Sequence, residues 1–233
     1  MKNSLLLVCV LATAAASNAA VVNVAAIEDN GFSGSAGGDL PTNNLVRVGT
    51  FDIDDSTISQ NSANPTFLNQ HFFEFGSTKI GAGTPGSATP GHFSSSLDNP
   101  ASDTSGPVGG FPNKQIYLWV FNSANNSTPT DSFNTAFEQG VFYFRMAVNP
   151  KWKFRDTEDI PNFSNIELTD LTTGANSETL SDDARVLIGL FGGDNSDSTG
   201  KTNFRLVPIP EPASVGILAA SGVALGLRRR RRG

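Results

Sequence analysis

Two histidines, His71 and His92, are the side chains of this chain best suited to proton transfer near neutral pH. His71 stands next to two phenylalanines, and His92 lies in a stretch rich in Gly and Pro. Neither belongs to a metal-ligand spacing such as H-E-x-x-H, and no G-x-S-x-G segment places a nucleophilic serine. We therefore expect His71 at the boundary of an apolar element and His92 in solvent, with no catalytic role for either.

Carboxylates are numerous enough to suggest glycoside hydrolysis, which needs two carboxyl groups facing each other across a sugar. The candidates for such a pair are Glu74, Glu138, Glu158 and Glu167. The sequence does not indicate which two converge, and exposed carboxylates need no functional explanation. We predict no enzymatic activity, no catalytic residue and no cofactor, and we keep a carbohydrate-cleaving enzyme as an alternative.

Segment 193–200 is the best candidate for a small binding site because it is rich in side-chain oxygens. Asp194, Asn195 and Asp197 could hold Ca²⁺, which prefers carboxylate, amide and carbonyl ligands. The segment lacks the spacing and the terminal Glu of an EF-hand, so we favour a solvated hairpin loop between the flanking strands. The acidic cluster at 52–55 has the same two interpretations, and we expect no metal at either place.

The two tryptophans differ in their surroundings. Trp119 lies in an apolar run and is expected in the core. Trp152 stands between Lys151 and Lys153, which predicts a half-exposed ring that packs with the lysine stems or serves as a platform for a sugar.

The composition excludes several classes of protein. The 233 residues include 17 Phe, which indicates a packed core, and 23 Gly and 13 Pro, which indicate many turns. A single Cys excludes a disulfide scaffold and a Cys-rich metal site. The net charge of −6 argues against nucleic acid as a partner.

Short runs of β-branched and aromatic residues, separated by turn residues, must position these side chains. Such runs occupy 21–27, 45–51, 115–121, 141–146, 185–191 and 203–207. One or two short helices are expected, one starting at Asn64-Pro65, where a strand to Phe75 is the alternative, and one within 131–139. This pattern predicts an all-β protein with one β-sandwich domain, of either jelly-roll or immunoglobulin-like topology.

Segment 76–112 interrupts the strand pattern. Gly and Pro are frequent in it, and Ser, Thr, Asp and Asn fill much of the remainder. A stretch of this length without periodicity predicts a surface loop or a disordered insertion in the sandwich.

The N-terminus has the features of an export signal. Lys2 supplies a positive charge, an apolar run covers 5–16, and small residues follow at 17–19. We expect signal peptidase to cut after Ala19 or Ala20. The only cysteine, Cys9, leaves with this segment, which excludes thiol chemistry in the mature chain.

The C-terminus combines three elements in order. Pro210-Glu211-Pro212 comes first, an uncharged and mostly apolar stretch follows at 213–227, and Arg228, Arg229, Arg230, Arg231 and Arg232 stand before the last residue. As a helix the apolar stretch spans about 22 Å, short of a bilayer core of about 30 Å. It can insert transiently, with the arginines on the cytoplasmic side and the rest of the chain exported.

These three elements resemble the PEP-CTERM sorting signal of Gram-negative bacteria. The resemblance implies that an exosortase, a transpeptidase-like membrane enzyme, cleaves near Pro-Glu-Pro and passes the protein to the cell surface or the extracellular matrix. It covers the C-terminal end alone and implies neither a fold nor an activity for the rest of the chain.

The expected organisation is a signal peptide at 1–20, a β-sandwich body at 21–207 and a sorting signal at 208–233. Removing both ends takes away six of the 16 Lys and Arg but only one of the 22 Asp and Glu, so the net charge falls from −6 to about −11. We expect an exported structural or adhesive protein of the surface or matrix, with extracellular polysaccharide as a partner. The alternative is a carbohydrate-binding or carbohydrate-cleaving module of the same matrix.

Overall fold

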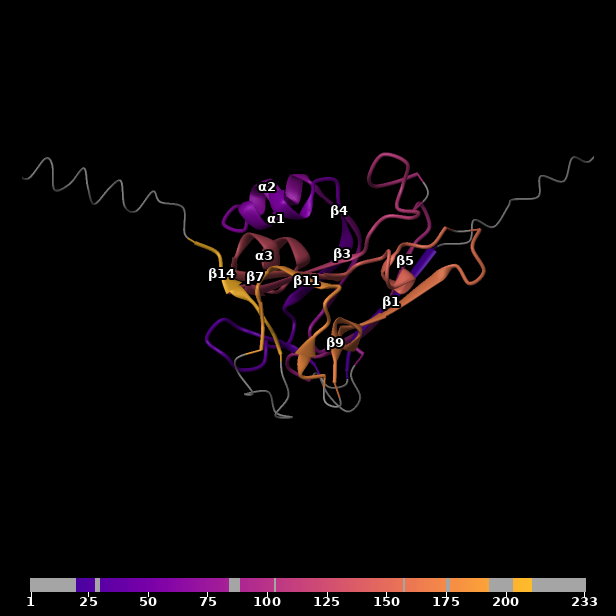
Figure 1. Ribbon diagram of the computed structural model, residues 1–233. Coiled ribbons are helices and arrows are strands. Elements are labelled where there is room, and N and C mark those ends of the chain that lie inside the picture. The colour runs from indigo at the N-terminus through magenta and orange to yellow at the C-terminus, as the bar shows by residue number, and fades with distance from the viewer. Residues whose placement is uncertain are drawn as a thin grey trace, which may run out of the picture.

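The computed structural model describes residues 20–27, 30–83, 89–102, 104–156, 158–174, 177–192 and 203–210. They form an all-β, sandwich-like fold, in which smaller sheets pack against one face of a six-stranded sheet and short helices cover the other face (Figure 1). This confirms the predicted fold class. The expected signal helix and C-terminal apolar helix lie outside the described residues.

The six-stranded sheet consists of β3 (Leu45–Phe51), β4 (Phe72–Lys79), β6 (Tyr117–Ser123), β7 (Ala136–Phe144), β11 (Ala184–Ile188) and β14 (Val207–Pro208). Its order is β11-β7-β6-β3-β4, with β14 also paired to β7, and all of these pairs are antiparallel. The central strand β6 is buried on both faces, which explains its unbroken run of aromatic and β-branched residues. In register, Arg47 of β3 lies opposite Trp119 of β6.

A three-stranded sheet contains β1 (Ala20–Ala26), β5 (Phe93–Asn99) and β8 (Phe163–Glu167), in the order β5-β1-β8. Two small sheets complete the strands: β2 (Phe32–Ser33), β12 (Leu190–Phe191) and β13 (Phe204–Arg205) in one, and β9 (Thr172–Thr173) and β10 (Thr179–Leu180) in the other. Because β1 pairs with β8 in parallel, and β13 with β2, the fold is not a wholly antiparallel sandwich.

The core between the sheets is apolar and largely aromatic. The ring of Phe142 on β7 lies 5.4 Å from Phe32, and Phe32 stacks on Phe93 of β5 at 6.2 Å. Strand β1 alternates buried and partly exposed residues, so its buried positions, such as Val22 and Val24, face this core.

Three helices of six residues each cover the opposite face of the large sheet (Figure 1). They are α1 (Asp55–Gln60), α2 (Pro65–Gln70) and α3 (Pro129–Asn134). Each begins with a capping side chain, and α2 and α3 carry Pro in the first turn, where its missing N–H costs no hydrogen bond. Two 3₁₀ turns, η1 (Pro150–Trp152) and η2 (Leu168–Leu171), lie beside β8.

Each predicted strand overlaps a strand of the structure, although the first and last residues differ for several of them. The run at 45–51 is β3, and the helix starting at Asn64-Pro65 is α2, although it ends at Gln70 and the alternative strand, β4, follows it. The helix expected within 131–139 starts earlier, at Pro129, and gives way to β7 at Ala136. Helix α1 is an addition to the one or two helices expected.

The prediction that 76–112 is a surface loop or disordered insertion is wrong for much of its length. Strand β4 runs into it, β5 lies within it, and Phe93 and Phe111 are fully buried. The glycines that suggested a loop serve the turns between these parts. Gly106, for example, has a φ of 87°, and a Cβ there would stand 2.5 Å from the Phe111 ring.

The two ends of the described body are both held by sheets. Strand β1 starts at Ala20, and after β14 the Ile209 N–H donates to the Phe137 carbonyl at 2.8 Å. The body therefore extends slightly beyond the expected limits of 21 and 207. In the part of the chain that the structure describes, no helix is both long enough and apolar enough to cross a membrane.

Candidate functional site

The residues expected to direct sorting lie mostly beyond the described chain. Ala19, Glu211, Pro212 and Arg228–Arg232 are outside it. Ala20 is the first residue of β1, is 2% exposed and pairs with Asn99 of β5. Pro210 is exposed at the end of the last described segment.

The expected Ca²⁺ ligands Asp194, Asn195 and Asp197 also lie outside the described residues. Among the residues that are described, no three His, Cys, Asp or Glu side chains come together as a metal site would require.

The histidines have structural partners. As expected, His71 lies at an element boundary: it follows α2, and its Nδ1 is 2.8 Å from Oδ1 of Asp52. The prediction that His92 lies in solvent is wrong. Its ring is buried, and Nδ1 donates to the Ala26 carbonyl at 3.0 Å, which ties the start of β5 to the end of β1.

Trp119 is fully buried as predicted, and its Nε1 donates to Oε1 of Gln139 at 2.9 Å. The prediction of a half-exposed Trp152 is wrong, and the alternative of a sugar platform at this ring is excluded with it. The turn η1 directs this indole inward, where Nε1 donates to Oδ2 of Asp170 at 3.2 Å. Lys151 remains outside and ion-pairs with the other oxygen of Asp170 at 3.5 Å.

The four candidate carboxylates have separate local roles. Glu138 is buried and accepts hydrogen bonds from the Ser35 backbone at 3.0 Å and from Asn122 at 2.7 Å. The other three are Glu74, which pairs with Arg47, Glu167, which caps η2, and Glu158, which is exposed in the loop after η1. The two pockets described below contain one of these four carboxylates each, Glu74 and Glu167, so neither pocket brings a candidate pair together.

The acidic cluster at 52–55 organises α1. Asp54 caps the helix by accepting from the Thr57 N–H at 2.7 Å. This bond and that from the Ser56 hydroxyl lower the pKa of the Asp54 carboxyl. Asp52 and Asp54 are exposed, as a solvated turn predicts, and the cluster in addition starts a helix that the sequence did not predict.

Asp55, the next residue, joins α1 to the sheet beneath it. Its carboxylate accepts hydrogen bonds from the hydroxyls of Tyr117 and Tyr143, the former at 3.3 Å. Burial, followed by the nearby Asp55 charge, raises the pKa of Tyr117 above its ordinary value, and burial with the Asp55 hydrogen bond does the same for Tyr143. Both phenols stay protonated and act as donors.

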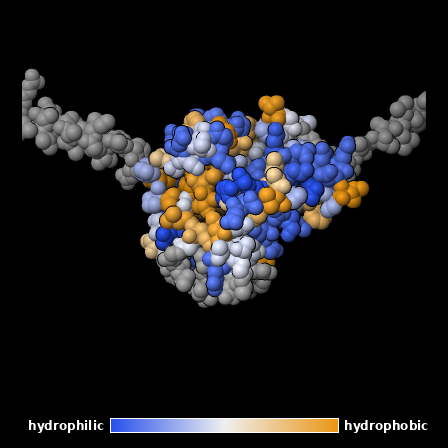
Figure 2. All heavy atoms as spheres, in the orientation of Figure 1, coloured by the Kyte–Doolittle hydropathy of each residue, from blue (hydrophilic) through white to orange (hydrophobic). Residues whose placement is uncertain are grey.

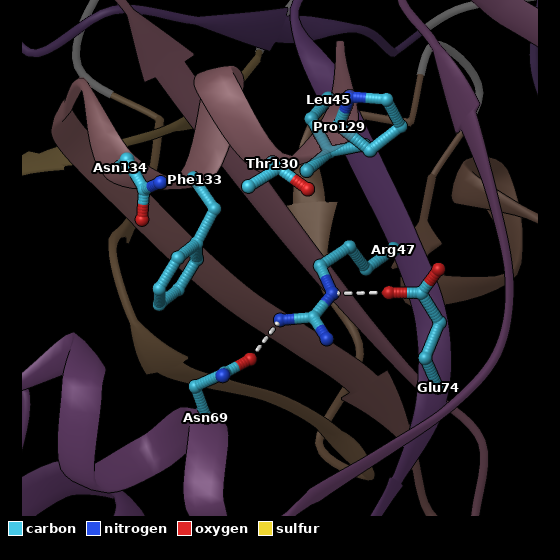
Figure 3. Close-up of a pocket in the computed structure, with 8 residues that line it drawn as sticks. All are labelled: Leu45, Arg47, Asn69, Glu74, Pro129, Thr130, Phe133 and Asn134. Carbon is cyan, nitrogen blue, oxygen red and sulfur yellow. Dashed lines mark hydrogen bonds and ion pairs between the residues drawn. The ribbon is translucent and has the colours of Figure 1, made fainter.

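One concave site lies on the helix-covered face, where α2 and α3 leave part of the sheet uncovered (Figure 3). It is a pocket of about 330 Å³. Its lining comes from β3, β4, α2 and α3 and consists of Leu45, Arg47, Asn69, Glu74, Pro129, Thr130, Phe133 and Asn134.

Arg47 occupies the centre of this pocket. Its Nε donates to Oε2 of Glu74 at 2.5 Å, and its Nη1 donates to Oδ1 of Asn69 at 2.7 Å (Figure 3). The guanidinium lies 4.7 Å from the centre of the Phe72 ring and 5.1 Å from that of Trp119. Its side chain is 12% exposed, so the charge is held by stacking and by two hydrogen bonds.

A second hollow, of about 410 Å³, lies over the outer face of the three-stranded sheet. It is lined by small and polar residues of β1, β5 and β8, and Asn23 donates to Asn165 across it at 2.7 Å. Its lining also includes three serines and Glu167, but it has no cationic side chain.

The sequence interpretation missed the Arg47 pocket. Its residues come from 45–47, 69–74 and 129–134, and only the fold brings these segments together. One signal was present: Arg47 shares a strand face with Leu45 and Phe51, and a charge on an otherwise apolar face requires a partner.

No family model matches the chain, and neither a curated protein nor a solved structure is significantly similar to it. Its function must therefore be argued from its own residues.

Proposed function

We propose that this chain is the precursor of an exported protein that serves as a structural or adhesive scaffold at the cell surface or in the extracellular polymer matrix. The observation that carries the proposal is the order of Pro-Glu-Pro, the apolar stretch 213–227 and Arg228–Arg232 at the C-terminus. Signal peptidase removes the N-terminal segment, and an exosortase-like enzyme acts at Pro-Glu-Pro.

The tail is suited to halting export because fixed positive charge follows its apolar stretch. A helix over 213–227, about 22 Å long at 1.5 Å per residue, can insert where the bilayer thins. The five guanidinium groups stay on the cytoplasmic side, because carrying them through the hydrocarbon core is prohibitive. The body is then held outside the membrane while it waits for processing.

The geometry of the body supports access to the cleavage motif. The last sheet hydrogen bond is donated by Ile209, and the next residue, Pro210, is exposed. Pro-Glu-Pro therefore begins immediately after the folded body, where a processing enzyme can reach it.

An apolar surface lies near the end of the described body. Figure 2 shows apolar side chains gathered over the region of β7, β11 and β14. Apolar residues of these strands that keep exposed surface are Phe137, Val186, Leu187 and Val207. A surface of this kind supports a role in contact with a membrane or a partner rather than in free solution.

At the other end we propose the cut after Ala19 instead of after Ala20. Ala20 is buried at the start of β1 and pairs with Asn99, so a cut after Ala19 leaves the strand whole. A cut one residue later would remove a buried residue from the three-stranded sheet.

The intact mass of the surface-exposed product tests both ends in one measurement, after expression of the full chain in a host with an exosortase system. We expect a chain that begins at Ala20 and ends near Pro-Glu-Pro. In a variant that lacks 210–233 the body should leave the cell envelope and appear in the medium. An unchanged envelope fraction, or a surface product with both termini intact, contradicts the proposal.

Carbohydrate binding in the same matrix is a second candidate, and the Arg47 pocket is the observation that favours it. Binding is favoured over cleavage because the pocket contains one carboxylate, Glu74, and that group is paired with Arg47.

A further inference from the structure

We propose that the Arg47 pocket binds one uncharged sugar unit of a polysaccharide, an inference that rests on the second candidate function above. The guanidinium of Arg47 donates to sugar hydroxyls, the Glu74 carboxylate accepts from them, and Phe133 forms an apolar wall beside the sugar ring. Asn69, Thr130 and Asn134 add amide and hydroxyl groups at the rim.

The first support is the fixed position of Arg47. Its guanidinium carbon lies 4.7, 5.1 and 5.7 Å from the ring centres of Phe72, Trp119 and Phe133. Two of its nitrogens donate hydrogen bonds, one to Glu74 and one to Asn69. A guanidinium has five N–H donors. Two are engaged by these contacts, and the others have no hydrogen-bond partner among the described residues. A ligand therefore meets donors that are already oriented, which reduces the entropic cost of binding.

The second support is the charge balance of the lining. Arg47 and Glu74 are its only charged members, and they form an ion pair at 2.5 Å. A carboxylate or phosphate ligand would compete with Glu74 for Arg47 and leave one anion without a partner. Neighbouring hydroxyls of a neutral sugar can accept from the guanidinium and donate to the carboxylate without separating the pair.

The third support is the size and shape of the site. At about 330 Å³ the pocket lies at the small end of the usual range of about 300–1,000 Å³ for ligand sites. It is partly open to solvent, with Asn69 of α2 and Phe133 of α3 among its lining residues (Figure 3). A pocket of this kind accommodates one sugar residue while the polymer continues on both sides.

The test uses the full-length protein in a zwitterionic detergent, because a glycoside detergent would itself compete. The methyl glycosides of glucose, galactose and mannose, together with glucuronic and galacturonic acid, are titrated by calorimetry and by saturation-transfer NMR. We expect at least one neutral glycoside to bind more tightly than either acid. Asn69→Ala should weaken that binding roughly tenfold, since it removes a polar group from the site. The matched control is Asn165→Ala, on β8 of the three-stranded sheet, which should leave the affinity for the glycoside unchanged.

Glu74→Gln gives a readout that a merely structural pocket would not produce. The variant leaves the Arg47 charge uncompensated, so a uronic acid should gain affinity relative to the neutral glycosides by roughly tenfold. No binding of any neutral glycoside, equal binding by the Asn69 and Asn165 variants, or an unchanged preference in Glu74→Gln overturns the proposal.

A polysaccharide co-sedimentation assay separates this inference from the function on which it rests. If the wild type and Asn69→Ala sediment equally with a neutral polymer such as dextran or cellulose, the protein binds carbohydrate elsewhere and the pocket assignment is wrong. If neither sediments and no glycoside binds, the carbohydrate-binding function itself is wrong.

Discussion

The two faces of the six-stranded sheet are built from different kinds of side chain. The face toward the three-stranded sheet carries apolar residues such as Val48, Leu118 and Phe142. The face under the helices carries Trp119 and other aromatic rings, but also Arg47, whose charge is paired. Where another sheet covers a face completely, a polar side chain on that face is buried away from water, which is unfavourable unless it has a hydrogen-bond partner. Three short helices cover their face incompletely. The charged side chain of Arg47 and the pocket around it lie where this cover is incomplete.

The largest effect is expected on the apolar face. The Phe142 ring is fully buried, contacts Phe32 and Phe204, and lies so close to Gly140 that a Cβ there would meet it at 2.5 Å. Phe142→Ala should lower the free energy of unfolding by about 3–5 kcal/mol, measured by denaturant titration. Phe137→Ala, on the same strand but 48% exposed, should cost less than about 1 kcal/mol. Similar losses in the two variants would contradict the assignment of Phe142 to the core.

A smaller effect is expected on the helix-covered face at high pH. The pKa of Tyr117 and of Tyr143 is raised in the folded state, whereas an unfolded tyrosine titrates near 10. Above pH 10 the unfolded chain therefore loses protons that the folded chain keeps, and the free energy of unfolding falls as pH rises. Each tyrosine contributes a slope of up to about 1.4 kcal/mol per pH unit.

Chemical unfolding between pH 9 and 11.5 measures this slope, and Tyr143→Phe is the matched variant. It should make the decline shallower, because one of the two titrating groups is gone. An identical slope in wild type and variant would show that Tyr143 binds its proton no more tightly in the folded than in the unfolded chain, which contradicts this prediction.

The smallest effect is expected at the cap of α3, the helix that carries Thr130, Phe133 and Asn134 into the pocket. Thr128 Oγ1 accepts from the Asp131 N–H at 3.1 Å. Thr128→Ala should cost about 1 kcal/mol of stability by thermal unfolding. It should also weaken any ligand of the pocket, whereas Thr128→Ser, which keeps the hydroxyl, should restore both properties.

The fold class was predictable because it follows from residue patterns within short segments of the sequence. The run at 45–51 alternates as a strand should, and Asn64-Pro65 marks the start of α2 through the cap and the fixed φ of proline. Trp119 was placed in the core by its apolar neighbours alone. In each of these cases the deciding interactions lie within a few residues.

The remaining features depend on contacts between distant residues. Trp152 has lysines on both sides, yet it is buried because Asp170 accepts from its indole. His92 and Phe93 are buried in a Gly-rich and Pro-rich segment because they pack against β1 and β2. The Arg47 pocket needs four elements at once. Composition averages over such positions and does not reveal them.

If the chain is exported as we propose, the pairing of β14 with β7 and of β1 with β8 has a consequence for the order in which the body folds. A chain that emerges N-terminus first presents β1 early, but its parallel partner emerges some 140 residues later. The last described strand, at 207–208, adjoins the tail. In a chain exported as proposed, both sheets can therefore be completed only once the residues next to the C-terminal tail have emerged.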